Sequence, residues 1–137
     1  MSGLSHITFM ARDVDRATAM LERILEGRVV YRGNGASRSR ETFLLVDDVW
    51  VAVVEGEGPA SATYDHVAFH VEDDELDERE QRARDLGLTI EPSRPRGPGE
   101  ARSVYIRDDD RHLIELHSGT LAERLAAHLA AHEEPSA

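Results

Sequence analysis

Two histidines and one glutamate have the residue types of a catalytic metal site. His6 and His66 lie 60 residues apart, in the strand-like stretches "LSHITFMA" and "TYDHVAFHV". Glu115 lies in the apolar run "LIELH", where a buried carboxylate is costly unless it meets a cation or a metal. Two imidazoles and one carboxylate with an open position are typical of a catalytic rather than a structural site. The spacing does not choose among Mn²⁺, Fe²⁺, Ni²⁺ and Zn²⁺.

An internal repeat gives the two histidines equivalent positions. A shift of 60 residues superimposes four pairs, His6 with His66, Phe9 with Phe69, Asp13 with Asp73 and Gly27 with Gly87. In the first copy Asp13 caps a helix that Gly27 ends, and the order of elements is β-α-β-β-β. A pseudo-twofold axis between two such copies brings His6 and His66 together across the cleft between them.

These patterns predict an α+β fold built from two paired βαβββ modules that form a cupped mixed sheet around a metal site. We expect a single domain over 1–137, with module 1 at 3–56, module 2 at 63–119 and a C-terminal helix at 120–132. The other histidines have no histidine at the matching position and are interpreted as structural, turn or surface residues; they are His70, His112, His117, His128 and His132.

Composition excludes several classes of function. The net charge of −11 argues against a nucleic-acid partner, because phosphate binding needs an excess of cations. The chain has no cysteine, which excludes thiolate metal sites, and none of its 16 basic residues is a lysine, which excludes Schiff-base chemistry. No apolar run approaches the roughly 20 residues of a membrane span, so we expect no membrane partner and a cytoplasmic protein.

Four segments resemble the vicinal-oxygen-chelate superfamily of glyoxalases, bleomycin resistance proteins and dioxygenases. They are "GLSHITF", "RETFLLVDDVWVAVVEG", "TYDHVAFHV" and "RPRGPGEARSVYIRDDDRHLIELHSGTLAERL". Within the superfamily they are most similar to the fosfomycin-resistance epoxide hydrolases (the X class), from about Gly3 to Leu125. The segment that starts at Arg94 is the most specific.

The resemblance implies a Mn²⁺-dependent hydrolase that adds water to the oxirane ring of fosfomycin, a small phosphonate epoxide. It implies His6, His66 and Glu115 as metal ligands and Glu41 as the general base. Positions that line the substrate pocket match Thr8, Trp50, Tyr64, Arg94, Ser103, Tyr105 and Arg124. Arg96 is a neighbouring candidate in the phosphonate loop, where Arg94, Arg96 and Arg102 lie within nine residues. The resemblance also implies a domain-swapped homodimer in which modules of different subunits pair.

The implied chemistry agrees with the residue types. A carboxylate can take a proton from an attacking water, arginines bind a phosphonate dianion through charge-assisted bonds, and a metal is a Lewis acid for the epoxide oxygen. Taken without the resemblance, Glu41 and the Arg-rich loop also fit solvated surface residues. Two positions depart from the family pattern. Ala101 replaces a residue that is usually glycine, and Arg111 replaces one that is usually glycine or asparagine. Ala101 puts the geometry of the substrate loop in question.

Two other functions fit the same sequence. A thiol transferase would keep the metal site and use glutathione or another thiol as the nucleophile. A non-catalytic drug-binding dimer of this fold needs no metal ligands, so the His6, His66 and Glu115 set counts against it.

Overall fold

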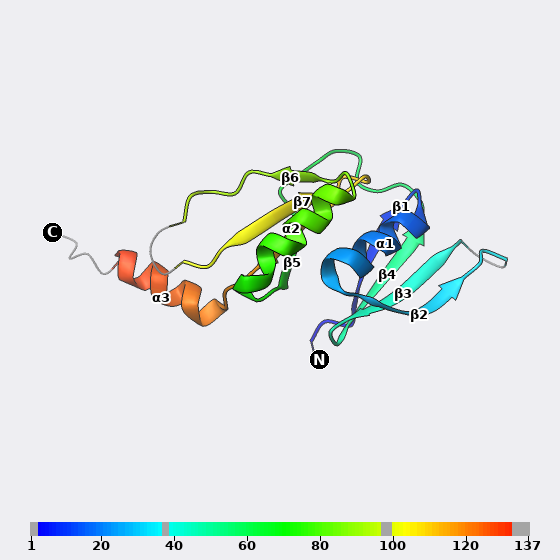
Figure 1. The fold of residues 1–137 in the computed structure, drawn as a ribbon. Coiled ribbons are helices and arrows are strands. Elements are labelled where there is room, and N and C mark those ends of the chain that lie inside the picture. Colours follow the sequence, from blue (N-terminus) through cyan, green and yellow to red (C-terminus); the bar gives the residue numbers. More distant parts are fainter. Residues whose placement is uncertain (1–2, 37–38, 97–99, 133–137) are drawn as a thin grey trace.

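The computed structural model describes residues 3–36, 39–96 and 100–132 (Figure 1). All the predicted strands and helices are present. In chain order the elements are β1 (His6–Ala11), α1 (Val14–Leu25), β2 (Arg28–Gly33), β3 (Glu41–Val46), β4 (Val49–Glu55), β5 (His66–His70), the 3₁₀ turn η1 (Asp73–Glu75), α2 (Leu76–Asp85), β6 (Thr89–Glu91), β7 (Ser103–Arg107), β8 (Leu113–His117) and α3 (Leu121–His132).

The two halves have the same topology, as the repeat predicts. The first half forms a four-stranded sheet in the order β1-β4-β3-β2, and the second forms a separate one in the order β5-β8-β7-β6. In each sheet the first strand runs parallel to the last strand of its module, and the other pairs are antiparallel. His6 and His66 are the first residues of β1 and β5, so the 60-residue shift is confirmed at the level of the fold.

Each sheet buries one face under its helix and leaves the other face open. Because successive side chains of a strand point to opposite faces, Phe9, Val51 and Leu44 lie on the side of α1 and are buried. Phe69, Ile106 and Leu116 do the same beneath α2. Burial of each such side chain contributes about 1.5–3 kcal/mol, so the helix-covered faces are the stabilising ones. The open faces are free to carry polar groups.

Details of the helix ends differ from the sequence predictions. The Asp13 cap is confirmed, because its carboxylate accepts a hydrogen bond from the Arg16 backbone N–H at 3.0 Å. The prediction that Gly27 ends α1 is wrong: Glu26 takes the left-handed conformation, with φ of 55°. A side chain at Gly27 would lie 3.1 Å from Leu44, so packing accounts for this glycine.

The match of Asp73 with the capping residue Asp13 implies a helix cap at Asp73 as well, and this expectation is wrong. The Asp73 side chain makes no cap on η1 or α2 and instead accepts a 3.0 Å hydrogen bond from Arg102. The Arg102 hydrogen bond lowers the pKa of Asp73. The glycine that matches Gly27 in the second half, Gly87, does have a left-handed φ of 76° directly after α2.

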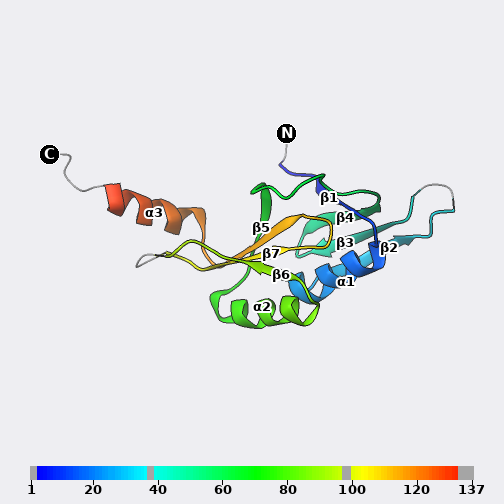
Figure 2. The same ribbon diagram turned by 90° about the horizontal axis from the view of Figure 1, so that it is seen from above.

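The modules join through their helices, which lie side by side (Figures 1 and 2). Arg79 of α2 is buried and donates from Nη1 to the carbonyl oxygen of Ile24 at 2.6 Å. Its Nη2 pairs with Glu26 at 2.9 Å. A guanidinium here satisfies carbonyl groups that the end of a helix leaves without partners.

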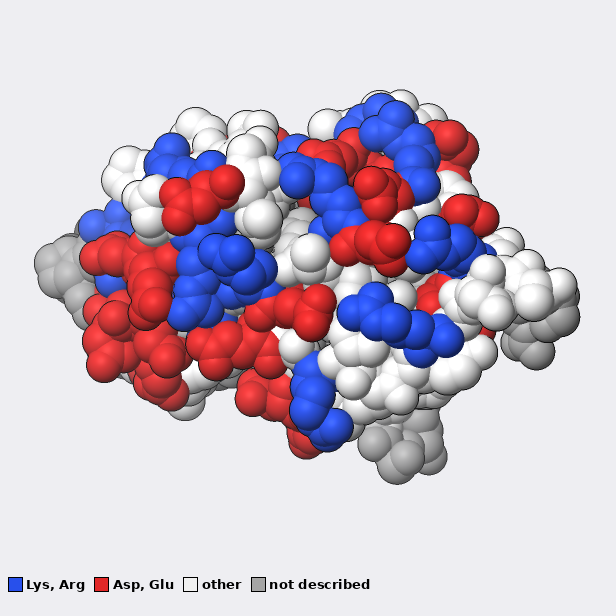
Figure 3. Space-filling model, turned by 45° about the vertical axis from the view of Figure 1, so that its right-hand side comes forward, with Lys and Arg blue, Asp and Glu red and all other residues white. Residues whose placement is uncertain are grey.

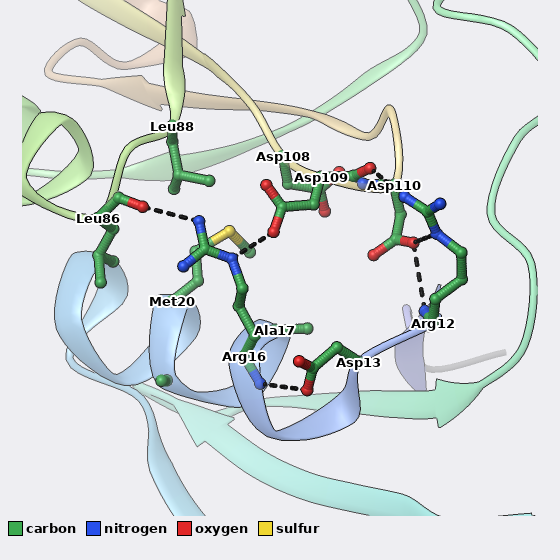
Figure 4. A pocket seen from close by; sticks show the side chains of 11 residues that line it. Arg12, Asp13, Arg16, Ala17, Met20, Leu86, Leu88, Asp108, Asp109 and Asp110 are labelled. Atoms are coloured by element: carbon green, nitrogen blue, oxygen red, sulfur yellow. Dashed lines mark hydrogen bonds and ion pairs between the residues drawn. The ribbon is translucent and has the colours of Figure 1, made fainter.

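A second contact between the modules involves the turn before β8. The backbone N–H and Nε of Arg12 donate to the buried Asp110 at 3.2 and 3.1 Å. Arg16 donates to the Asp109 carboxylate and to the carbonyl oxygen of Leu86 (Figure 4). Arg111 in this turn has φ of 71°, which explains why glycine or asparagine is usual at the position.

Replacing Arg79 by Ala should lower the free energy of unfolding by about 2 kcal/mol, because the buried carbonyl of Ile24 loses its donor. Urea denaturation measures the change. Arg84→Ala is the matched control, since Arg84 lies on the same helix, is exposed and pairs with Glu80 at 3.4 Å. Equal midpoints for the two variants would contradict the role given to Arg79.

Positive and negative side chains alternate on the surface. On the face that Figure 3 shows, arginines lie next to carboxylates rather than in a separate basic patch. Helix α3 extends away from both sheets (Figures 1 and 2) and exposes Leu121, Leu125 and Leu129. No helix in the described ranges is both long and apolar enough to cross a membrane.

Candidate metal and substrate site

The open face of the first sheet carries every site residue predicted in module 1. Strand pairing places His6 opposite Trp50, and Thr8 lies two residues along β1 on the same face. Glu41 belongs to this face because its partner on β4, Val54, is itself opposite Met10. The His6 ring stacks on Trp50 with centroids 4.1 Å apart, and its Nδ1 lies 3.0 Å from Ser5 Oγ.

Two polar groups of this face have no partner among the residues that the structure describes. The Glu41 carboxylate makes no hydrogen bond or ion pair with any other described residue. Trp50 Nε1 is buried and has no acceptor within the same ranges. A buried indole N–H without an acceptor is uncommon, so this N–H is a candidate donor to a bound molecule.

The open face of the second sheet brings His66 and Glu115 together. His66 Nε2 lies 3.0 Å from Oε1 of Glu115, which is 5% exposed. His66 Nδ1 lies 2.7 Å from the carbonyl oxygen of Tyr64, which only accepts, so Nδ1 carries the proton and donates. In the neutral ring Nε2 therefore faces the carboxylate with a lone pair. A cation between the two atoms satisfies both, so the pair fits a divalent metal.

The predicted pocket tyrosines lie beside this pair. The hydroxyl groups of Tyr64 and Tyr105 are 3.1 Å apart, and the Tyr105 ring meets the His66 ring edge-on at 5.6 Å. Burial, the hydrogen bond with Tyr64 and the Glu115 charge raise the pKa of Tyr105 to about 12. Tyr105 is therefore a neutral hydroxyl group at physiological pH.

The raised pKa of Tyr105 predicts a loss of stability at alkaline pH. An unfolded tyrosine ionises near pH 10, whereas folded Tyr105 keeps its proton up to a pKa of about 12. Between these values the folded state binds more protons than the unfolded state, so the free energy of unfolding falls as the pH rises. Denaturation at increasing pH should show a smaller decline for Tyr105→Phe than for the wild type; an identical decline would contradict this.

The three predicted ligands do not form one cluster within a single chain. Across 3–36, 39–96 and 100–132, no three His, Cys, Asp or Glu side chains lie close enough to hold a metal. His66 and Glu115 form one half-site on the second sheet, and His6 lies on the first sheet. The pseudo-twofold axis suggested that His6 and His66 would meet across the modules of one chain. In the described part of the chain they do not.

A narrow cavity gathers the basic residues predicted to bind the phosphonate. Arg94, Arg96 and Arg124 line it together with Glu100, Ala101, His117 and Thr120. Glu100 pairs with Arg94 at 2.8 Å and lies 3.8 Å from Arg96. Arg102 lies elsewhere, because its guanidinium binds Asp73 and Asp77 at 3.0 and 3.1 Å. Arg94 and Arg96 are therefore the arginines of this loop that line the cavity, and Glu100 lies between them as a counter-charge.

Sequence reasoning missed His117. The structure places His117 on the same face of β8 as Glu115, with Nδ1 2.7 Å from Ser103 Oγ and 3.2 Å from Glu115 Oε2. Its separation of two residues from Glu115 in a strand is the signal that could have identified it. His70 also lies on this face, opposite His117, but it is exposed and its nearest carboxylate, Glu72, is 4.0 Å away.

A larger cavity of about 400 Å³ lies between the modules (Figure 4). Its apolar walls include Met20, Leu86 and Leu88, and its rim holds Arg12 and Arg16 with their aspartate partners. It contains none of the predicted site residues, and it lies on the helix side of the sheets. The residues that could do chemistry are on the opposite, open faces.

Comparison with known proteins identifies the family. The model of the Glyoxalase/Bleomycin resistance protein/Dioxygenase superfamily matches residues 3–116. The fosfomycin resistance protein FosX of Mesorhizobium japonicum is 48% identical over 128 residues, which cover 92% of each chain. This chain belongs to the FosX family.

Two further comparisons agree with this assignment. The FosX protein of Listeria innocua is 44% identical, over 91% of this chain and 96% of that protein. The crystal structure of a glutamate-to-glutamine mutant of FosX from Listeria monocytogenes, complexed with Mn(II) and 1S,2S-dihydroxypropylphosphonic acid, has a TM-score of 0.85 at 40% identity. The structural match covers 93% of this chain and 98% of the Listeria monocytogenes chain. The metallothiol transferase FosB of Shouchella clausii is 30% identical, over 92% of this chain and 86% of that protein.

Proposed function

We propose that the protein is a Mn²⁺-dependent epoxide hydrolase that inactivates fosfomycin by adding water to its oxirane ring. The His66–Glu115 pair carries the proposal, because its two facing acceptor atoms fit a divalent cation. The ligand of the Listeria monocytogenes FosX structure is a vicinal-diol phosphonate, which is what addition of water to fosfomycin yields, and that structure contains Mn(II).

His6, His66 and Glu115 are the proposed metal ligands. When bound, Mn²⁺ supplies a Lewis acid for the epoxide and phosphonate oxygens. The protein orients His66 for this role, since the hydrogen bond from Nδ1 to the Tyr64 carbonyl leaves Nε2 as the ligand atom. Burial of Glu115 keeps water away from its carboxylate and strengthens its attraction for a cation.

Glu41 is the proposed general base. It lies on the same open face as His6, and no neighbouring cation or donor occupies its carboxylate within the described part of the chain. A free carboxylate can accept the proton of the water that attacks the epoxide carbon. The neutral hydroxyl group of Tyr105 does not compete for that proton.

The remaining pocket residues bind and orient the substrate in this proposal. Arg94 and Arg124 line one cavity and provide charge-assisted hydrogen bonds to the phosphonate, with Arg96 beside them. Thr8 and Trp50 approach from the first sheet, and Ser103 and Tyr105 approach from the second. A phosphonate dianion would replace the Glu100 carboxylate as the partner of Arg94.

We propose that the complete site forms in a domain-swapped homodimer. One chain presents two open sheet faces, one with His6 and Glu41 and the other with His66 and Glu115. Pairing the first module of one subunit with the second module of its partner covers both faces. The leucines of α3, which are 49–74% exposed, then have an apolar surface available on the partner. A cytoplasmic location remains part of the proposal.

The test is incubation of Mn²⁺-loaded protein with fosfomycin, with and without glutathione, and analysis of the products by phosphorus NMR. The expected product is the diol phosphonate, formed at the same rate in both reactions. A product that retains the thiol would support a metallothiol transferase, which is the second candidate because of the similarity to FosB. Binding of fosfomycin without turnover would support a drug-binding protein instead.

A further inference from the structure

The two oxygens of Glu115 have different surroundings. Oε1 faces His66 Nε2 at 3.0 Å, on the side of the proposed metal. Oε2 points the other way and accepts a 2.7 Å hydrogen bond from Ser103 Oγ. Because the carboxylate is buried, rotation about its last bond would break contacts on both sides. The position of Oε1 is therefore set by what holds Oε2.

The Ser103 hydroxyl group donates to Glu115 and accepts its second hydrogen bond from His117. A hydroxyl group has one proton, and the Ser103 proton goes to Glu115 Oε2, which can only accept. Ser103 Oγ also lies 2.7 Å from His117 Nδ1, so this second contact requires a proton on Nδ1. The donors then form one directed chain from His117 Nδ1–H to Ser103 Oγ–H to Glu115 Oε2. His117 Nδ1 also approaches Oε2 directly, at 3.2 Å.

Packing holds the His117 ring in this orientation. The side chain is 19% exposed, and strand pairing places His117 opposite Ser103. A Cβ atom at Gly119 would lie 3.0 Å from His117 Nε2 and 2.5 Å from the Cβ of Ala101. Glycine at 119 thus leaves the space that the ring and Ala101 occupy. The Ser103 hydrogen bond on one side of the ring and Gly119 on the other therefore define its orientation.

We propose that His117 is a positioning residue for the metal centre. Through the Ser103 hydroxyl it fixes the Glu115 carboxylate so that Oε1 alone faces His66. The inference rests on the proposed function only in assuming that a divalent metal binds between His66 and Glu115. Partners that orient metal ligands typically contribute 10- to 100-fold to metal affinity, and we expect an effect of about this size. The same chain of donors directs the Ser103 proton to Glu115 and leaves Ser103 Oγ less able to donate to a substrate.

The experiment measures the Mn²⁺ affinity of the full-length protein by isothermal titration calorimetry and by the loss of the free Mn²⁺ EPR signal, without substrate. His117→Leu should weaken binding by about 10- to 100-fold. His117→Asn should bind within about threefold of the wild type, because the Asn Nδ2–H₂ group takes the place of Nδ1–H. The matched control is His70→Leu, on the same open face and opposite His117, which should bind as the wild type does.

A double-mutant cycle tests the chain of donors itself. If His117 acts through Ser103, Ser103→Ala weakens binding as His117→Leu does, and the double variant is no weaker than either single variant. Wild-type affinity in His117→Leu, or an Asn variant as weak as the Leu variant, would overturn the positioning role alone. A wild-type protein that binds no Mn²⁺ would overturn the metal site and the inference together. Circular dichroism spectra of all variants exclude loss of fold as the cause.

Discussion

Replacing Glu41 by Gln should lower the rate of diol formation by about 10²- to 10⁴-fold and leave Mn²⁺ affinity unchanged. The amide keeps the size of the side chain but cannot accept a proton from water. Glu41 is not one of the proposed metal ligands, so metal binding should not respond. The substitution therefore separates the base from the metal site.

The position of Glu41 supports a large effect. It is the first residue of β3, half-buried on the open face of the first sheet, and its Cγ would lie 3.3 Å from a Cβ atom at Gly33. The absence of a side chain at Gly33 therefore leaves room next to Glu41. A carboxylate in such a place, with no ion pair among the described residues, has both oxygens available to a substrate water.

The matched control is Glu55→Gln. Glu55 is exposed at the end of β4, in the same sheet, but its partner on β1 is Ala11, so it lies on the helix side. This variant should retain wild-type activity. Diol formation by Glu41→Gln at the wild-type rate would remove Glu41 from the mechanism, and weaker Mn²⁺ binding would point to a ligand role instead.

The fold could be predicted because periodicity and parity act within short segments. Both modules share the order of strands and helix, and the 60-residue shift places His6 and His66 at the same register. Parity also places the predicted strand residues of each module on its open face. The helix ends were harder to predict, because Asp73 binds Arg102, a residue 29 positions away that no local pattern connects to it.

The limits of sequence reasoning at the site have the same physical origin. Symmetry selected His66 and set His117 aside, since His117 has no equivalent in the first half. Its contact with Ser103 depends on which side chains face each other across β7 and β8, and the repeat, which matches positions of the backbone, does not give this. Symmetry also cannot say whether two modules pair within one chain or between two chains. In the described part of one chain the ligands form two half-sites, and an experiment on the dimer tests whether they join.

That experiment is a mixture of inactive chains. His6→Ala and Glu115→Ala should each be inactive alone, because each lacks a proposed ligand at both sites of the dimer. In a mixed dimer, intact His6 of one subunit meets intact His66 and Glu115 of the other at one of the two sites. Dimers that carry two different affinity tags, purified over both, should therefore show about half of wild-type activity.

A second pair of variants provides the control that makes the result specific. His66 and Glu115 lie 3.0 Å apart in the same chain, so each site of a mixed His66→Ala and Glu115→Ala dimer lacks one ligand. This mixture should stay inactive. Recovery in both mixtures would mean that metal ligands exchange between subunits in another way, and recovery in neither would place the complete site within a single chain. Recovery only in the mixture of His6→Ala with Glu115→Ala assigns His6 to the partner subunit's site. In that mixture alone, the two substituted ligands lie in different modules.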